Sequence, residues 1–573
     1  MIGNIGPRRG GVARNRGRGG PDTRYAASRP GPQASGRRSP VAGRRGTLPH
    51  SMAAPTPVAS AHCDREREHM SENLRREVSK VVDQEVARIL EQTDRDVTRT
   101  VNRALGVAED AATFDAARWQ GRLDELLTAH RIPGAVLAVL ADGEIHDVAS
   151  GILHTGTGVA VSTDSVFQIG SVSKGYTAAM VVLLAEAGKL DLDAPVVDVL
   201  PGFAVADAEA SRTITPRQLL NHTSGIEGDY VNDTGRGDDC LARYIEGARD
   251  VGLTNPPGAT VSYSSTAYNV LGRIVEVVTG GTWDEALKEL LVAPLGLEHT
   301  MTLPEEVLRF RSAMGHMGDP GEEPVPTPLW NMLPRSAGPY GGICATAADV
   351  ARFARLFVDG GVAPDGTRVL PGAVVEAMLN REVEMPDQWF LGGHWGLGWG
   401  LFEWDGVRGF GHDGSTFGQL AYLRAMPEKG LAVVLLTNGG GAAPKVFEAL
   451  CRELSAELAG VTMPGFAPPV EPVAVETGAF LGRYKREGFL MTIAEGEGEG
   501  EGTLRLTYEG ADGLKGTFDP LVWELTPVSH TPEKTVFAGR RNEKDTWIPV
   551  VFYALEDGSR YVHFGVRATA KAA

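Results

Sequence analysis

The sequence has few cysteines and no long hydrophobic run. Four cysteines occur in 573 residues, far apart and without a CxxC pair, so neither a zinc site nor a disulfide framework is indicated. We expect free, mostly buried thiols, which fit a reducing compartment. No stretch of about 18 apolar residues is present, so no membrane-spanning helix is expected. No apolar stretch of about 7–15 residues follows the arginine-rich start, as a secretory signal requires, and we therefore expect a cytoplasmic protein.

Acidic residues outnumber basic ones beyond the first 50 residues. The formal net charge is −17, yet residues 1–50 hold eleven arginines, no lysine and a single acid, Asp22. The rest of the chain is therefore strongly acidic and would repel the phosphates of a nucleic acid along most of its surface. We expect no nucleic-acid partner.

The first part of the chain differs from the rest in composition. Residues 1–62 are rich in Gly, Arg, Pro and Ser, a composition that predicts disorder. The GRG-like pieces resemble nucleic-acid-binding tails, but a non-functional extension upstream of a true start at Met52 or Met70 is the favoured interpretation. In residues 70–110, apolar positions recur at three- and four-residue steps between charges, which predicts an amphipathic helix. It either packs on the body or pairs with another chain.

Residues 114–460 have the pattern of an α+β body. Residues 115–130 have a helical pattern, and two strand-like stretches then meet at Asp142-Gly143, a hairpin signal. Helical patterns follow, and residues 409–437 alternate like neighbouring strands. Strands at both ends with helices between them predict one sheet covered by helices.

The C-terminal part has an all-β pattern. Residues 461–477 contain four prolines and are expected to form a stiff linker. Residues 478–573 contain short strand-like segments separated by turn residues, which predicts a small antiparallel barrel or sandwich; the segments are FLGRYK, FLMTI, TLRLTY, KTVFAG, WIPVVFYA and YVHFGV. The EGEGEGEG run (495–502) is expected to be a solvated hairpin loop, since Gly-Glu repeats lack the fixed geometry of a metal site.

Ser171 and Lys174 are the first candidates for chemistry. They lie three residues apart in FQIGSVSKGYTAAMV (167–181), where a helical pattern begins. Positions i and i+3 share a helix face, so the amine can reach the hydroxyl and act as its base if burial lowers the amine's pKa. Taken alone, the pair is equally well read as a capping serine and a surface lysine.

Two later segments supply further candidates. Tyr263 lies in PGATVSYSSTAYNVLG (257–272), on an apparent loop before a helix, and His412 lies in GFGHDGSTFG (409–418). Gly414 would let backbone approach a substrate closely. In isolation, a partly buried tyrosine and a histidine at a strand edge are the simpler interpretations.

Together these segments resemble the serine β-lactamase and penicillin-binding-protein superfamily. The order S-x-x-K, then Tyr, then an H-x-G strand is that of its class C β-lactamase-like branch, which includes esterases, D-aminopeptidases and DD-peptidases. The resemblance covers residues 114–455 and is supported by three further stretches: LLNHTSGI (219–226), YGGICATAADVARF (340–353) and WGLGWGLF (395–402). It implies an antiparallel sheet flanked by helices, with a helical subdomain.

The resemblance also implies roles for individual residues. Ser171 would be the nucleophile, Lys174 its proton partner and Tyr263 the general base or acid. His412 would orient the substrate where many relatives have Lys. The backbone amides of Ser171 and Ser415 would form the oxyanion hole, each typically worth about 3 kcal/mol of barrier.

Two departures from the family pattern bear on specificity. The usual Asn of Y-x-N is Ser265 here, and His412 replaces a permanent cation. Because that cation helps to hold antibiotic carboxylates in relatives, esterase or peptidase activity is favoured over β-lactam hydrolysis. The C-terminal strands, which open with FLGRYK, resemble the lipocalin-like domains of penicillin-binding-protein-type thioesterases that release and cyclise nonribosomal peptides.

We therefore expect a serine hydrolase that cleaves ester or amide bonds, including those of peptides and D-amino acids, through an acyl-enzyme. The alternatives are a thioesterase or peptide cyclase, a true β-lactamase, and a non-catalytic binding member of the fold. The sequence has no G-x-S-x-G and no H-E-x-x-H. A small-molecule or peptide substrate is expected, with no cofactor and no metal, and the oligomeric state is left open.

Overall fold

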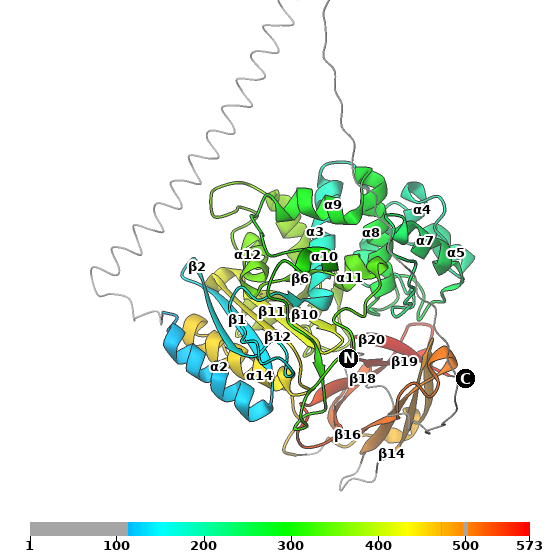
Figure 1. The fold of residues 1–573 in the computed structure, drawn as a ribbon. Helices are drawn as coiled ribbons and strands as arrows, with labels where there is room; N and C mark the ends of the chain where they lie inside the picture. Colours follow the sequence, from blue (N-terminus) through cyan, green and yellow to red (C-terminus); the bar gives the residue numbers. More distant parts are fainter. Residues whose placement is uncertain (1–112, 472, 497–501, 573) are drawn as a thin grey trace, which may run out of the picture. The chain divides into compact units, whose positions relative to one another are not determined.

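A computed structural model of the chain describes residues 113–471, 473–496 and 502–572 (Figure 1). The disorder predicted for residues 1–62 and the helix predicted for residues 70–110 lie outside these ranges, as does Cys63. The other three cysteines, Cys240, Cys344 and Cys451, are free and buried, as predicted. Within the described ranges, no helix has the length and apolar character needed to cross a membrane.

The body is built on one antiparallel sheet, as predicted from the sequence, and this sheet has eight strands. Its first hairpin turns at Asp142 and Gly143, whose positive φ values of 52° and 79° suit the mirror-image turns that join adjacent strands. The strand order is β2-β1-β12-β11-β10-β9-β8-β7. Strand bounds are β1 (Gly134–Ala141), β2 (Glu144–Gly151), β7 (Val383–Glu384), β8 (His394–Trp395), β9 (Gly400–Trp404), β10 (Val407–Thr416), β11 (Gln419–Met426) and β12 (Leu431–Thr437).

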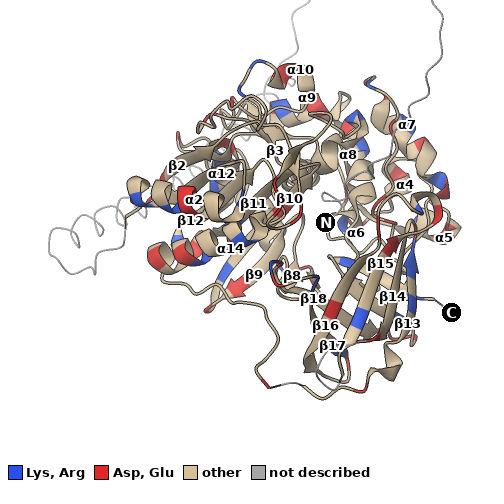
Figure 2. Ribbon diagram, turned by 60° about the horizontal axis from the view of Figure 1, so that its bottom comes forward, with Lys and Arg blue, Asp and Glu red and all other residues tan. Residues whose placement is uncertain are grey.

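Helices cover both faces of this sheet because its central strands are apolar on both sides. Every residue of β1 and β12 is buried. On one face, α2 (Ala116–His130) and α14 (Ala443–Leu454) pack a core that includes Trp119 and Leu450. Arg122 of α2 pairs with Glu453 of α14 at 2.7 Å, and charged residues of both signs lie on both helices in Figure 2.

The opposite face carries the larger core and the helical part of the body. Here α3 (Ser173–Glu186) packs beside α8 (Ser265–Thr279) and α12 (Ala347–Val358) (Figure 1). The remaining helices are shorter: α4 (Val196–Val199), α5 (Ala208–Thr213), α6 (Pro216–Leu220), α7 (Cys240–Gly247), α9 (Trp283–Leu287), α10 (Pro304–Val307), α11 (Gly338–Gly341) and α13 (Gly372–Leu379). Two small pairs complete the body: β3 (Phe167–Gln168) with β6 (Cys344–Ala345), and β4 (His316–Met317) with β5 (Val325–Pro326).

The C-terminal part is a closed eight-stranded antiparallel barrel, in agreement with the predicted all-β domain. Its strands follow chain order: β13 (Gly482–Arg486), β14 (Phe489–Glu495), β15 (Leu504–Gly510), β16 (Leu521–His530), β17 (Lys534–Arg540), β18 (Ile548–Ala554), β19 (Arg560–Phe564) and β20 (Arg567–Lys571). Sequence patterns had indicated neither β16, which contains Pro527, nor β20. The short segment β20 becomes a strand because it pairs with β19 on one side and β13 on the other, which closes the barrel.

Candidate active site

Ser171 lies in a short 3₁₀ turn, Gly170–Val172, directly before α3. Gly170 has a positive φ of 50°, and a Cβ there would lie 2.6 Å from the backbone N of Ser415 in β10. A Cβ on Gly414 would lie 1.9 Å from the Ile169 carbonyl oxygen and 3.2 Å from the backbone N of Ser171. The two glycines therefore let this turn approach β10 closely, which brings the backbone amides of Ser171 and Ser415 into one region.

Lys174, in the first turn of α3, is fully buried beside the serine. Its Nζ lies 3.2 Å from Ser171 Oγ, 3.3 Å from Ser265 Oγ and 3.0 Å from the Tyr340 carbonyl oxygen. Burial lowers the pKa of this amine well below its ordinary range, and the positive charge of Arg567 lowers it further. A neutral amine has two N–H donors and one lone pair. It can therefore donate to two of these oxygens and accept a hydrogen bond from a hydroxyl.

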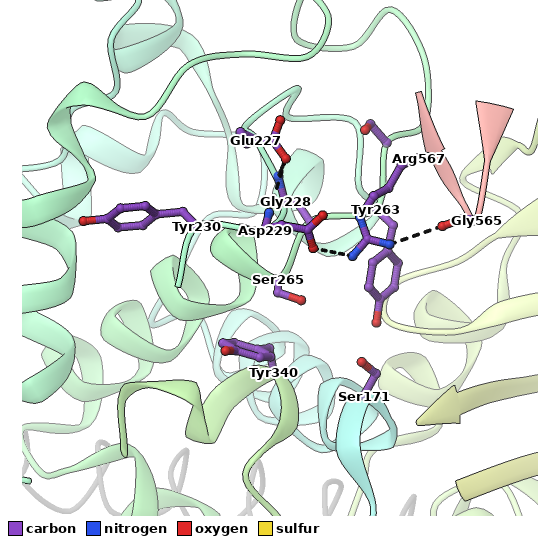
Figure 3. Close-up of polar contacts among 12 residues, drawn as sticks. Ser171, Glu227, Gly228, Asp229, Tyr230, Tyr263, Ser265, Tyr340, Gly565 and Arg567 are labelled. Atoms are coloured by element: carbon purple, nitrogen blue, oxygen red, sulfur yellow. Dashed lines mark hydrogen bonds and ion pairs between the residues drawn. The ribbon is translucent and has the colours of Figure 1, made fainter. Parts of the chain in front are cut away.

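Tyr263 reaches the same place from the segment that precedes α8. Its ring points toward Ser171 in Figure 3. Its hydroxyl lies 3.3 Å from His412 Nε2, and Lys174 Nζ lies 4.7 Å from the centre of its ring. Burial raises the pKa of the phenol, against an opposing contact with the Ser171 hydroxyl. The phenol is therefore protonated at rest and is placed to give a proton rather than to act as a free phenolate.

His412 is a buried neutral imidazole on β10. Its Nδ1 lies 2.6 Å from the carbonyl oxygen of Asp413, so Nδ1 carries the proton and Nε2 accepts from Tyr263. Burial, followed by the nearby Lys174, lowers the pKa of His412 to about 3. No permanent cation therefore stands at this position, in line with the expectation drawn from the replacement of Lys.

Ser265, which takes the place of the family's Asn, is the first residue of α8. Its hydroxyl faces Lys174 at 3.3 Å and lies with Tyr340 on the side of the site opposite Tyr263 (Figure 3). The structure thus brings together five side chains from a 3₁₀ turn, the helices α3 and α8, the segment before α8 and the strand β10: Ser171, Lys174, Ser265, Tyr263 and His412.

Four charged residues beside the site were not identified from the sequence. Asp229, on a loop of the body, accepts from Arg567 of the barrel at 2.6 Å (Figure 3). It also accepts from Arg486 at 2.7 Å. Arg486 also contacts Glu227 at 3.1 Å. Burial raises the pKa of Asp229, but the attraction of the two guanidinium groups outweighs it and lowers the pKa to about 2. The guanidinium carbon of Arg567 lies 5.3 Å from the centre of the Tyr263 ring.

The barrel also contacts the backbone of the catalytic tyrosine candidate. The Tyr263 N–H donates to the carbonyl oxygen of Val566 at 2.9 Å. Val566 lies in the β19–β20 hairpin with a φ of 62°, an uncommon conformation for a β-branched residue. Its side chain packs in one apolar cluster with Tyr263 and Trp395. No sequence motif identifies the β19–β20 hairpin, because its contact with Tyr263 depends on how the barrel packs against the body.

No metal centre is evident in the part of the chain that the structure describes. Among those residues, no group of three or more His, Cys, Asp or Glu side chains is arranged to hold a metal ion. The assembled side chains are a serine hydroxyl, an adjacent buried amine and a phenol, groups that can serve as a nucleophile, a base and a proton donor.

The chain belongs to the β-lactamase family, whose model matches residues 119–456, and it is a serine hydrolase. This confirms the family resemblance seen in the motifs. Penicillin-binding protein 4 of Amycolatopsis lactamdurans is 58% identical over 377 residues, which cover 65% of this chain and 99% of that protein. Esterase EstB of Burkholderia gladioli is 33% identical over 231 residues, 38% of this chain and 58% of EstB.

Among solved structures, the chain is similar to SurE. The TM-score is 0.63 and the sequences are 27% identical, with 80% of this chain and 99% of the SurE chain covered. This share exceeds that of the family match, so the similarity to SurE includes residues outside 119–456. A second SurE structure contains D-Leu and has a TM-score of 0.61.

Proposed function

We propose that this chain hydrolyses ester or amide bonds of small molecules or peptides through an acyl-enzyme on Ser171. One observation carries the proposal: a fully buried lysine amine with a lowered pKa lies 3.2 Å from the serine hydroxyl. Only the neutral amine can take the serine proton, and the lowered pKa favours that form over the ammonium form of an exposed lysine.

The contacts support a simple division of the proton transfers. Lys174 takes the proton of Ser171 as the oxygen attacks the substrate carbonyl, and the amides of Ser171 and Ser415 stabilise the oxyanion. As the carbonyl–leaving-group bond breaks, the leaving group receives a proton from Tyr263. The phenol is then reprotonated from the Lys174 ammonium. In the second half, water attacks the acyl-enzyme and gives one proton to these same groups, which pass it to Ser171 Oγ as the bond between that oxygen and the acyl carbon breaks.

The charges of the site favour neutral acyl groups over β-lactam antibiotics. His412 is neutral, and the guanidinium of Arg567 beside Tyr263 is already paired with Asp229 at 2.6 Å. A substrate carboxylate would therefore meet no free cation from either residue. This supports esterase or amidase activity rather than efficient β-lactam hydrolysis.

Covalent labelling tests the nucleophile. Incubation with a fluorophosphonate should add one label per chain by intact mass, and fragmentation should place it on Ser171. The Ser171→Ala variant should remain folded and unlabelled. Ser173→Ala is the matched control, since Ser173 lies in the same peptide but is buried against the Ile343 N–H at 3.2 Å. A label on another serine would contradict the proposal.

A substrate panel tests the specificity. Short-chain p-nitrophenyl esters and D-amino-acid amides should be turned over faster than nitrocefin. Nitrocefin turnover above roughly 100 per second, within the range of efficient enzymes, would count against it.

A second function, transfer of the acyl group to an amine, is favoured by the similarity to SurE. One of the SurE structures was determined with D-Leu, and its similarity to this chain includes residues beyond the body. If the site transfers acyl groups, addition of D-Leu amide during ester turnover should yield the acylated amide by mass spectrometry. Release of the free acid alone would leave hydrolysis as the function.

A further inference from the structure

His222 occupies an unusual position next to Tyr263. It belongs to the stretch LLNHTSGI, just after α6, and is completely buried. Its backbone has a φ of 61°, in the left-handed region that Asn and Gly prefer among the common residues. Neither the nucleophile nor the proton transfers described above make direct use of this side chain.

His222 holds the backbone on both sides of Tyr263. The Ser262 N–H donates to the His222 carbonyl oxygen at 2.9 Å, and the Ser264 N–H donates to His222 Nδ1 at 3.1 Å. Between them, the Tyr263 N–H donates to Val566 at 2.9 Å. Three successive N–H groups are therefore each bound to a buried acceptor, and two of these acceptors belong to His222. The left-handed backbone of His222 lets its carbonyl and its ring face the same segment.

The ring of His222 also supports the phenol itself. The two ring centres lie 4.4 Å apart with the planes tilted by 42°. Because Ser264 N–H donates to Nδ1, the imidazole proton must sit on Nε2. The rings of Tyr268 and Trp395 lie 5.2 and 4.9 Å from the imidazole centre. Burial holds the pKa of His222 well below its ordinary range, so Nδ1 stays an acceptor.

We propose that His222 is a positioning residue that fixes the Tyr263 phenol over Ser171 through its carbonyl oxygen, its Nδ1 acceptor and its ring. The inference rests on the proton-donating role of Tyr263 in the proposed function. Displacement of a proton donor by about 1 Å can reduce turnover on the order of a hundredfold, while substrate binding by other groups is kept.

Two substitutions of His222 distinguish the effect of losing the Nδ1 acceptor from the effect of changing the side-chain volume. In His222→Asn, the amide oxygen takes the place of Nδ1, and Asn tolerates the left-handed backbone. In His222→Leu the acceptor is lost at similar volume. We expect the Leu variant to lower kcat for a p-nitrophenyl ester by about thirtyfold or more, with KM changed less than about threefold. The Asn variant should retain kcat within about fivefold of the wild type.

A double-mutant cycle shows whether His222 acts through Tyr263. In a Tyr263→Phe background, His222→Leu should change kcat by less than about twofold, because the group that it positions is gone. An equal loss in both backgrounds would overturn the inference, as would an Asn variant as slow as the Leu variant. If Tyr263→Phe is itself neutral, the proton role of Tyr263 fails, which is a distinguishable result.

Two further variants control for lost stability and for a His222→Leu protein that does not fold. Leu450→Ala removes a buried side chain from the core on the other face of the sheet and serves as the control for lost stability. It should lower Tm while kcat stays near the wild-type value below the transition. If His222→Leu fails to fold, His222→Gln replaces it, since the Gln amide reaches past the Nδ1 position. A Gln variant as active as the Asn variant would overturn the inference.

Discussion

At the scale of single residues, Lys174 sets the chemistry of the site. Its pKa is lowered by burial, which favours the neutral amine, and its three hydrogen bonds are all to oxygen atoms. Spacing identified Lys174 as the partner of Ser171, since three residues of helix place both on one face. Its protonation state follows from the residues around it, which come from distant parts of the chain.

The lowered pKa of Lys174 should reduce the free energy of unfolding of the protein. Between its lowered folded pKa and its unfolded pKa near 10.4, the unfolded chain binds a proton that the folded chain does not. This opposes folding more strongly as the pH falls. We expect inactive Lys174→Met to have a Tm at least about 2 °C above wild type at pH 7, with a smaller difference at pH 10. Differential scanning calorimetry at both pH values checks this, and a lower Tm at pH 7 would contradict it.

Removal of the Tyr263 hydroxyl should affect turnover and leave binding largely unchanged. Its pKa is raised and it donates to His412, and in the proposed function it acts in proton transfer. We expect Tyr263→Phe to lower kcat for esters about a hundredfold or more with little change in KM. Steady-state kinetics from pH 6 to 9 measure this. A variant that keeps more than half of the wild-type kcat across that range would show that Tyr263 is only a packing residue.

At the scale of elements, β13 and the β19–β20 hairpin attach the barrel to the wall of the site. The Arg486 side chain on β13 is 5% exposed and bridges Glu227 and Asp229, whereas its neighbour Lys485 pairs with Asp512 at the surface, where both side chains are about half exposed. The sequence patterns indicated β13 as a strand. Successive side chains of a strand point to opposite faces, so Lys485 and Arg486 point in opposite directions. The patterns gave no sign of which face docks on the body, because the whole barrel sets that face.

This contrast predicts unequal effects of two neighbouring substitutions. Arg486→Met leaves two buried carboxylates with one fewer partner and should lower the free energy of unfolding by about 3–5 kcal/mol. Lys485→Met breaks an exposed pair and should cost less than about 1 kcal/mol. Urea unfolding followed by fluorescence measures both values. Equal losses would mean that the buried charges contribute no more than the surface pair.

At the scale of the whole molecule, the body and the barrel belong to one compact unit. Contacts between them include the Asp229 pairs, the Tyr263–Val566 hydrogen bond, and Thr260 Oγ1 at 3.0 Å from Tyr553 Oη. Several of these groups are buried charges that would be exposed or left unpaired if the barrel separated. The cytoplasmic location and the absence of a nucleic-acid partner stay predictions from the sequence.

This arrangement predicts that the body and the barrel unfold together. Calorimetry of the full chain should show one transition, whose calorimetric enthalpy equals its van't Hoff enthalpy. The Arg486→Met variant, which weakens the contact, serves as the comparison and should shift or broaden the transition. Two separate transitions in the wild-type protein would show that the interface contributes little to stability.

The sequence by itself determined the family, the α+β body with its C-terminal all-β domain, and the candidate residues Ser171, Lys174, Tyr263 and His412. Each of these depends on local spacing or on motif order along the chain, which a single sequence displays. Tertiary structure alone decided the protonation states and the part that the barrel plays in the site. Arg567 meets Asp229 across 338 positions of sequence, and the pKa shifts of Lys174 and His412 arise first from burial. Both depend on which distant segments exclude water from the site, and no local pattern records that.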